Sequence, residues 1–196
     1  YNVTNVLAAN AGSVVANTKV ASVSIVDSAA NVATSLDALQ NVAASGKLNA
    51  IALSGGATNV GISFKQLTAD ATAISKLDPA VGLTVSGATV ANITNNTAAL
   101  ANSKVTAITL SDTSANLVAS LDALANNANA AKISAISLSG AQSLAITAGQ
   151  LTADAAILNK LGAGVSFTVS GMSAVAATGT LDSRISSSVV YWRAMP

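Results

Sequence analysis

The sequence predicts the α/β class, arranged as a right-handed α/β solenoid with a parallel sheet on one side and helices on the other. Three observations lead to this prediction. Residues 27–55 and 112–140, which lie 85 positions apart, share 16 identities in 29 aligned positions. A second block, Gln-Leu-Thr-Ala-Asp, occurs at residues 66–70 and again at 150–154. Short stretches with strand-like alternation also precede stretches whose apolar residues have helical spacing.

The internal repeat sets the expected organisation of the chain. Each 85-residue unit is expected to hold three strand–helix turns of roughly 23 to 32 residues, a length typical of solenoid repeats. Strands that alternate with helices pair in parallel through right-handed crossovers. A doubly wound open sheet is the rival architecture, but it predicts no sequence period. We expect one array with the parts 1–19 (partial turn), 20–104 (first unit), 105–188 (second unit) and 189–196 (terminal strand and tail).

The first unit opens with a strand over residues 20–26, where Val23 and Ile25 alternate with serines. Asp27 is expected to cap the following helix, residues 30–42, by accepting a free backbone N–H. Gly46 is typical of the exit from that helix. The rest of the unit is expected to contain strands at 50–54, 60–64 and 82–86, a helix near 68–77 with Asp70 in its first turn, and a weaker helix at 90–100.

The second unit is expected to follow the same order. Its strands are predicted at residues 105–110, 135–138, 144–146 and 165–169, and its helices at 114–128, 152–161 and 174–186.

The composition limits the classes of function. The chain is 51% hydrophobic but only 3% aromatic, so small aliphatic side chains must form its core. A net charge of +1 with 9% charged residues argues against a nucleic-acid partner, which needs a basic face. The mean hydropathy of +0.56 is high, but polar residues interrupt every apolar run before about 18 residues, so no transmembrane segment is expected. The absence of cysteine excludes disulfide bonds.

Few residue types in the chain are able to carry catalysis. It has no His, Cys or Glu, and its eight acids are all Asp, which removes the usual zinc ligands and the Ser-His-Asp arrangement. Six of these acids form three repeat pairs: 27/112, 37/122 and 70/154. A carboxylate pair for glycoside hydrolysis need not be duplicated, whereas helix caps recur in every repeat. We therefore expect no catalytic, cofactor-binding or metal-binding residues.

Calcium is the weaker alternative among cofactors. Calcium-binding solenoids use Gly-Gly-x-Gly-x-Asp runs, which supply carbonyl and carboxylate oxygens at fixed spacing. Only Gly55 and Gly56 resemble such a run, and no Asp stands beside them.

The residues that depart from the repeat lie near the C-terminus. Aromatic residues and arginine are enriched at interaction hot spots, and a terminal strand would lie at the open end of a solenoid. We therefore expect an interface formed by Arg184, Val189, Tyr191, Trp192 and Arg193.

The repeated motifs resemble those of a known kind of protein. The pattern Asp-(Ser/Thr)-x-Ala-Asn, then Leu-Asp-Ala-Leu, Gln-Leu-Thr-Ala-Asp and Thr-Val-Ser-Gly, covers about residues 19–171. It is similar to Ala-rich repeats in very large secreted or surface proteins of Gram-negative bacteria, of the adhesin-like or RTX type. The resemblance implies an extracellular structural protein. It does not extend to the calcium-binding nonapeptides of such proteins, which are missing here.

These observations predict a non-enzymatic scaffold at the bacterial surface or in the secreted fraction. Its copies would associate end to end as a filament, or its repeats would form a rigid adhesin stalk. A module that binds a glycan or surface ligand is the second hypothesis, although it would need unrepeated aromatic residues on one face. A carboxylate hydrolase is the third, and only Asp78 and Asp182 are unrepeated acids that it could use.

Overall fold

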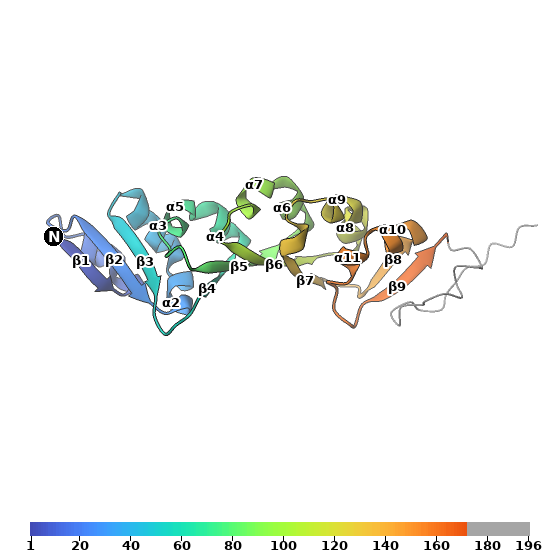
Figure 1. The fold of residues 1–196 in the computed structure, drawn as a ribbon, viewed down its shortest axis with the longest axis horizontal. Helices are drawn as coiled ribbons and strands as arrows, with labels where there is room; N and C mark the ends of the chain where they lie inside the picture. Colours follow the sequence, from blue (N-terminus) through green and yellow to red (C-terminus); the bar gives the residue numbers. More distant parts are fainter. Residues whose placement is uncertain (172–196) are drawn as a thin grey trace, which may run out of the picture. The chain divides into compact units, whose positions relative to one another are not determined.

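The computed structural model describes residues 1–171. Strands and short helices alternate along this part of the chain, which confirms the α/β class (Figure 1). The strands are β1 (Asn2–Val6), β2 (Ser22–Asp27), β3 (Leu48–Leu53), β4 (Asn59–Ser63), β5 (Gly82–Ala88), β6 (Val105–Asp112), β7 (Ile133–Leu138), β8 (Ser143–Thr147) and β9 (Ser166–Ser170). The strands predicted between residues 20 and 169 all appear among them, and β1 is an additional strand that the sequence pattern did not predict. The terminal strand expected in residues 189–196 lies outside the described residues.

The helices are short. They are η1 (Ala8–Asn10), α1 (Ala11–Val15), α2 (Ala29–Thr34), α3 (Leu36–Ala44), α4 (Phe64–Ala69), α5 (Ala71–Ile74), α6 (Val90–Asn95), α7 (Thr97–Leu100), α8 (Ser114–Ala119), α9 (Leu121–Ala125), η2 (Ala130–Lys132), α10 (Ala148–Ala153) and α11 (Ala155–Leu158). The helix expected at residues 174–186 lies outside the described residues.

The chain divides into two compact units whose ranges interleave, because residues 88–97 belong to the second unit whereas residues 98–108 belong to the first. Unit 1 holds the sheet β1-β2-β3 and, in a second sheet, β4, β5 and the start of β6. Unit 2 holds the end of β6 with β7, and the two-stranded sheet β8-β9. The described parts are Tyr1–Gly87 with Ala98–Ile108 for unit 1, and Ala88–Thr97 with residues 109–171 for unit 2.

The parallel registers place apolar side chains of successive strands in line. Ile25 stands beside Ile51 in the first sheet, and Val60 beside Leu83 in the second. These four side chains are at most 1% exposed, while alternate residues of β2 and β4 are more accessible. Because side chains alternate across a strand, each sheet contributes one apolar layer to the core. The core is thus formed by aliphatic ladders, as the low aromatic content predicts.

Within residues 1–171, each long helix predicted from the sequence is two shorter helices, so those predictions were wrong in extent. Ser35, with φ −95° and ψ 4°, separates α2 from α3, and Ser120 separates α8 from α9. Asp70 separates α4 from α5 at φ −107° and ψ 28°, and Asp154 separates α10 from α11. Apolar spacing alone does not reveal these breaks, because the apolar residues keep helical spacing on both sides.

The expected role of Asp27 as a helix cap also needs correction. The residue that caps α2 is Ser28, whose side chain accepts a hydrogen bond from the Asn31 backbone N–H at 3.2 Å. Thr113 does the same for α8. Asp27 is the last residue of β2, one position before the cap, and its carboxylate has other partners.

Substitution of Ser63 by alanine should lower the free energy of unfolding by about 1 kcal/mol, because it removes a capping box. The Ser63 hydroxyl accepts from the Gln66 N–H at 3.1 Å, and the Gln66 side chain accepts from the Ser63 N–H at 3.0 Å. Thr147 and Gln150 repeat the motif in unit 2, so Thr147→Ala should have a similar effect. Urea unfolding followed by circular dichroism measures both. The exposed Ser54→Ala is the control, and an equal loss there would contradict the prediction.

Candidate functional site

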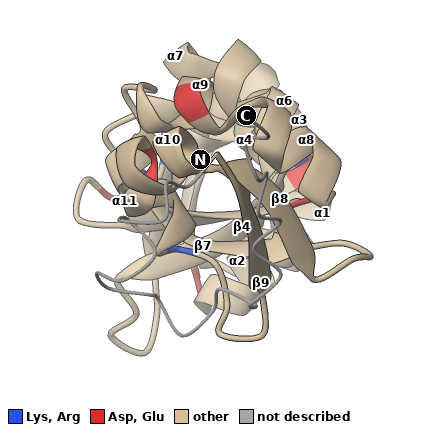
Figure 2. Ribbon diagram, turned by 90° about the vertical axis from the view of Figure 1, so that its right-hand side faces the viewer, with Lys and Arg blue, Asp and Glu red and all other residues tan. Residues whose placement is uncertain are grey.

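The expected interface residues Arg184, Val189, Tyr191, Trp192 and Arg193 lie outside the described residues. Among residues 1–171, the side chains with distinctive chemistry are the repeated aspartates. Charged positions are sparse along the ribbon (Figure 2), in keeping with a content of 9%. Five buried polar or charged side chains occur in this part, and four of them are Asp27, Asp70, Asp112 and Asp154.

Asp27 and Asp112 make the same three hydrogen bonds in their respective units. One oxygen of Asp27 accepts from the Ala8 N–H at 2.9 Å, and the other accepts from the Ser28 N–H at 2.8 Å and the Asn31 side-chain amide at 2.7 Å. Asp112 accepts hydrogen bonds of the same three lengths from the equivalent donors of unit 2, which are the Val90 N–H, the Thr113 N–H and the Asn116 side-chain amide.

These contacts favour the ionised form of both carboxyl groups. The hydrogen bond from Asn31, followed by that from Ala8, lowers the pKa of Asp27. Burial raises the pKa of Asp112, but the hydrogen bonds from Asn116, Val90 and Thr113 together lower it. Ala8 and Val90 are each the first residue of a helix from the preceding turn of the chain. A carboxylate satisfies the free N–H groups there.

Other polar side chains reach helix ends in the same manner. The Gln66 amide donates to the Ala33 carbonyl in α2 at 2.9 Å, 33 residues earlier in the chain. The Lys47 ammonium donates to the carbonyl of Val15, the last residue of α1, also at 2.9 Å. Such donors satisfy carbonyls that have no partner within their own helix. The polar side chains of the repeat thus join consecutive turns.

A second kind of aspartate pair was not foreseen from the sequence. The Asp70 carboxyl lies beside that of Asp37, and the Asp154 carboxyl beside that of Asp122, where the helices of consecutive turns pack together. Asp70 and Asp154 are each 2% exposed, and one oxygen of each, Oδ2, has no hydrogen-bond partner among the described residues. The expected placement of Asp70 in a first helical turn was wrong, because it lies at the α4–α5 break. The sequence feature that points to these pairs is that Asp37 and Asp70 both recur in the second repeat unit, as Asp122 and Asp154.

Burial and the neighbouring acid shift both buried carboxyls in the same direction. Burial, followed by the hydrogen bond with Asp37, raises the pKa of Asp70 to about 6, and Lys65 opposes the rise. Burial and the hydrogen bond with Asp122 raise the pKa of Asp154. Glycoside hydrolases use a pair of carboxyl groups that contact the substrate, whereas Asp70 and Asp154 are buried.

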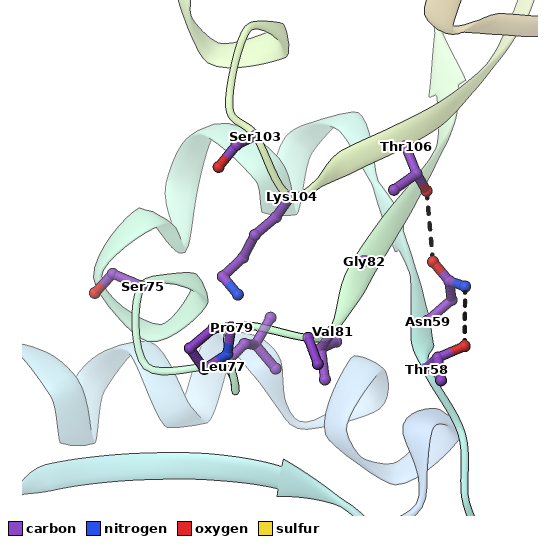
Figure 3. Close-up of a pocket in the computed structure, with 11 residues that line it drawn as sticks. Thr58, Asn59, Ser75, Leu77, Pro79, Val81, Gly82, Ser103, Lys104 and Thr106 are labelled. Atoms are coloured by element: carbon purple, nitrogen blue, oxygen red, sulfur yellow. Dashed lines mark hydrogen bonds between the residues drawn. The ribbon is translucent and has the colours of Figure 1, made fainter.

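A cleft of about 590 Å³ opens in unit 1 between the start of β5 and the start of β6 (Figure 3). The Lys104 side chain extends toward Pro79, and its ammonium donates to the Asp78 carbonyl at 2.8 Å. At the other end, the Asn59 side chain lies between Thr58 and Thr106. The lining holds no carboxylate side chain and no aromatic ring, so it has neither a catalytic acid nor a stacking surface for a sugar.

The described residues hold no group of three or more acidic, histidine or cysteine side chains that could bind a metal ion. Asp78, an unrepeated acid, accepts from the Ala80 N–H within its own turn at 2.9 Å. Asp182 lies outside the described residues. Within residues 1–171, no helix has the length and hydrophobicity needed to cross a membrane.

Comparison with protein-family models, with curated proteins and with solved structures gave no match for this chain.

Proposed function

We propose that this chain is a non-enzymatic structural scaffold, an α/β solenoid from a secreted or surface-exposed bacterial protein. The observation that carries the proposal is the matched geometry of Asp27 and Asp112. Two aspartates in different units accept from equivalent donors at 2.9, 2.8 and 2.7 Å. Residues that repeat with the same contacts serve the fold of each turn, whereas an active site needs to be built only once.

The parallel bridges support a solenoid, and its expected right hand rests on the general preference of parallel crossovers. Ile51 of β3 forms a parallel bridge with Leu77, and Ile136 of β7 forms the equivalent bridge with Leu161. Leu77 follows α5 and Leu161 follows α11, so each bridge pairs a strand with the segment that comes after the next pair of helices, 25 or 26 residues later. Such pairing of successive turns is expected of a solenoid. The extracellular location rests on the resemblance to adhesin-like repeats.

Self-association is the mechanism that we propose for filament or stalk formation. Strand β1 pairs with β2 on one side, and it is the edge strand of its sheet among residues 1–171. Tyr1 and Leu7, at its two ends, are the exposed large hydrophobic residues of this part, at 79% and 53%. An open edge with unpaired backbone groups accepts a further strand, so a strand of a second copy would continue the parallel sheet.

Electron microscopy and light scattering of the purified chain over a range of concentrations test this function. We expect linear assemblies that lengthen with concentration. Leu7→Lys should suppress them, because a charge directly after the edge strand β1 opposes pairing with a second copy. Ala57→Lys, which adds the same charge in an exposed turn, is the matched control. Monomers at all concentrations, or equal suppression by both variants, would refute end-to-end association and leave a stalk of linked repeats.

A further inference from the structure

The paired aspartates occupy equivalent places in the two units. Asp70 lies between α4 and α5, beside Asp37 in the first turn of α3. In the second unit, Asp154 lies between α10 and α11, beside Asp122 in the first turn of α9. The two members of each pair are 33 and 32 residues apart in the chain, so each pair joins consecutive turns. Asp37 and Asp122 are exposed, whereas their partners are buried.

The buried Oδ2 atoms of Asp70 and Asp154 have no hydrogen-bond partner among the described residues, so each pair lacks a hydrogen-bond donor. An ionised carboxyl only accepts hydrogen bonds, so two ionised carboxyls cannot bond to each other. A protonated carboxyl donates one hydrogen bond. A single proton therefore gives the buried acid a donor group for its neighbour and removes a buried charge, which is costly to leave unpaired.

We propose that Asp37–Asp70 and Asp122–Asp154 are proton-binding sites, each holding one proton between its two carboxyl groups in the folded chain, and that loss of these protons weakens the fold. The sites go beyond the scaffold function and do not depend on self-association. They would make the repeat an acid-stabilised structure.

The charged groups around the two pairs differ, because a lysine that opposes proton binding lies near the first pair only among the packed helices. Asp37 is the only charged residue of α3, Lys65 is the only one of α4, and α5 has none. Asp122 is the only charged residue of α9, and α10 and α11 have none, because Gly149 stands where unit 1 has Lys65. The pKa of Asp70 is raised to about 6 despite Lys65, and that of Asp154 is raised with no cation beside it.

The direction of the pH effect follows from linkage. An Asp of the unfolded chain has a pKa near 3.9. Between that pH and about 6, the folded chain binds more protons at Asp70 than the unfolded chain does, so stability decreases as the pH rises. The stabilisation is fully present below pH about 3.9 and is lost as the pH passes about 6. Each pair changes the unfolding equilibrium constant by up to about tenfold per pH unit within its window.

Carbon-13 NMR titration of the aspartate carboxyl groups in the full chain, between pH 3 and 8, tests the proposal directly. We expect the Asp70 carboxyl to titrate at about pH 6, and the Asp154 carboxyl to titrate above the value of an aspartate in the unfolded chain. Lys65→Ala should raise the midpoint of the Asp37–Asp70 pair and leave the Asp122–Asp154 pair unchanged. If every carboxyl titrates near or below pH 4, the proposal is wrong.

Urea unfolding at pH 5 and 7.5 supplies the second test. The unfolding constant of the wild-type chain should increase at least tenfold between these values. In the variant D70N/D154N, amides replace the protonated acids and donate permanently to Asp37 and Asp122, so the increase should disappear. Asp78→Asn removes an exposed acid and should keep the wild-type increase. A pH dependence retained in D70N/D154N would overturn the proposal, and the titration decides alone if that variant does not fold.

Discussion

Asp27→Ala is expected to lower the free energy of unfolding by about 3 kcal/mol. The substitution removes a charged acceptor of three hydrogen bonds and leaves the N–H of Ala8, which is 1% exposed, without its partner. Hydrogen bonds to charged groups stabilise a fold by about 1.5 to 3 kcal/mol, and an unsatisfied buried donor adds a penalty. Urea unfolding at pH 7, followed by circular dichroism, measures the loss.

Asp112→Ala provides the matched test in unit 2 and should have a similar effect, because its hydrogen bonds have the same lengths. The effect of Asp27→Ala should also depend on pH. The pKa of Asp27 is lowered in the fold, so its contribution is present above about pH 3.9 and is lost as the pH falls below that value. The exposed Asp78→Ala is the control, expected to change stability by less than 1 kcal/mol. An equal loss from Asp78→Ala would contradict the role given to Asp27.

Leu39→Ala should destabilise the chain by about 3 kcal/mol, since it opens a cavity in the core. Leu39 lies on α3, which packs against α1 and α5, and its side chain is fully buried at 0% exposure. In a core made of small aliphatic side chains, few large neighbours can move to fill the space. Urea unfolding with circular dichroism again gives the measurement.

Leu124, the repeat equivalent of Leu39, is also 0% exposed, so Leu124→Ala should match it. Asn41→Ala, at an exposed position of the same helix, is expected to change stability by no more than about 0.5 kcal/mol. If Leu39→Ala were as mild as Asn41→Ala, the packing of α3 against its neighbours would not contribute as described.

The sequence predicted the strands well because their signal is local. Alternation in residues 20–26 marks β2, and the repeat then identifies β6. The helix breaks at Ser35 and Asp70 were missed because Ser and Asp disfavour helix interiors only mildly, and the apolar spacing continues across both positions.

The partners of the aspartates could not be predicted for a related reason. Asp27 resembles a cap because Ala29 begins a helix two residues later, but the decisive donor is Ala8, 19 residues earlier. The partner of Asp70 is 33 residues away. Periodicity shows that Asp37 and Asp70 recur together, but only the winding of the chain brings their side chains into contact.

The turn between β3 and β4 differs in length from the turn between β7 and β8, although the strands on both sides correspond. Unit 1 has Gly55 and Gly56, both with positive φ, where unit 2 has Gly140 alone. One repeat has therefore gained or lost a residue here without change to the aspartate contacts on either side. These loops are the natural places to insert a foreign peptide, because added length there leaves the register of every hydrogen bond between turns intact.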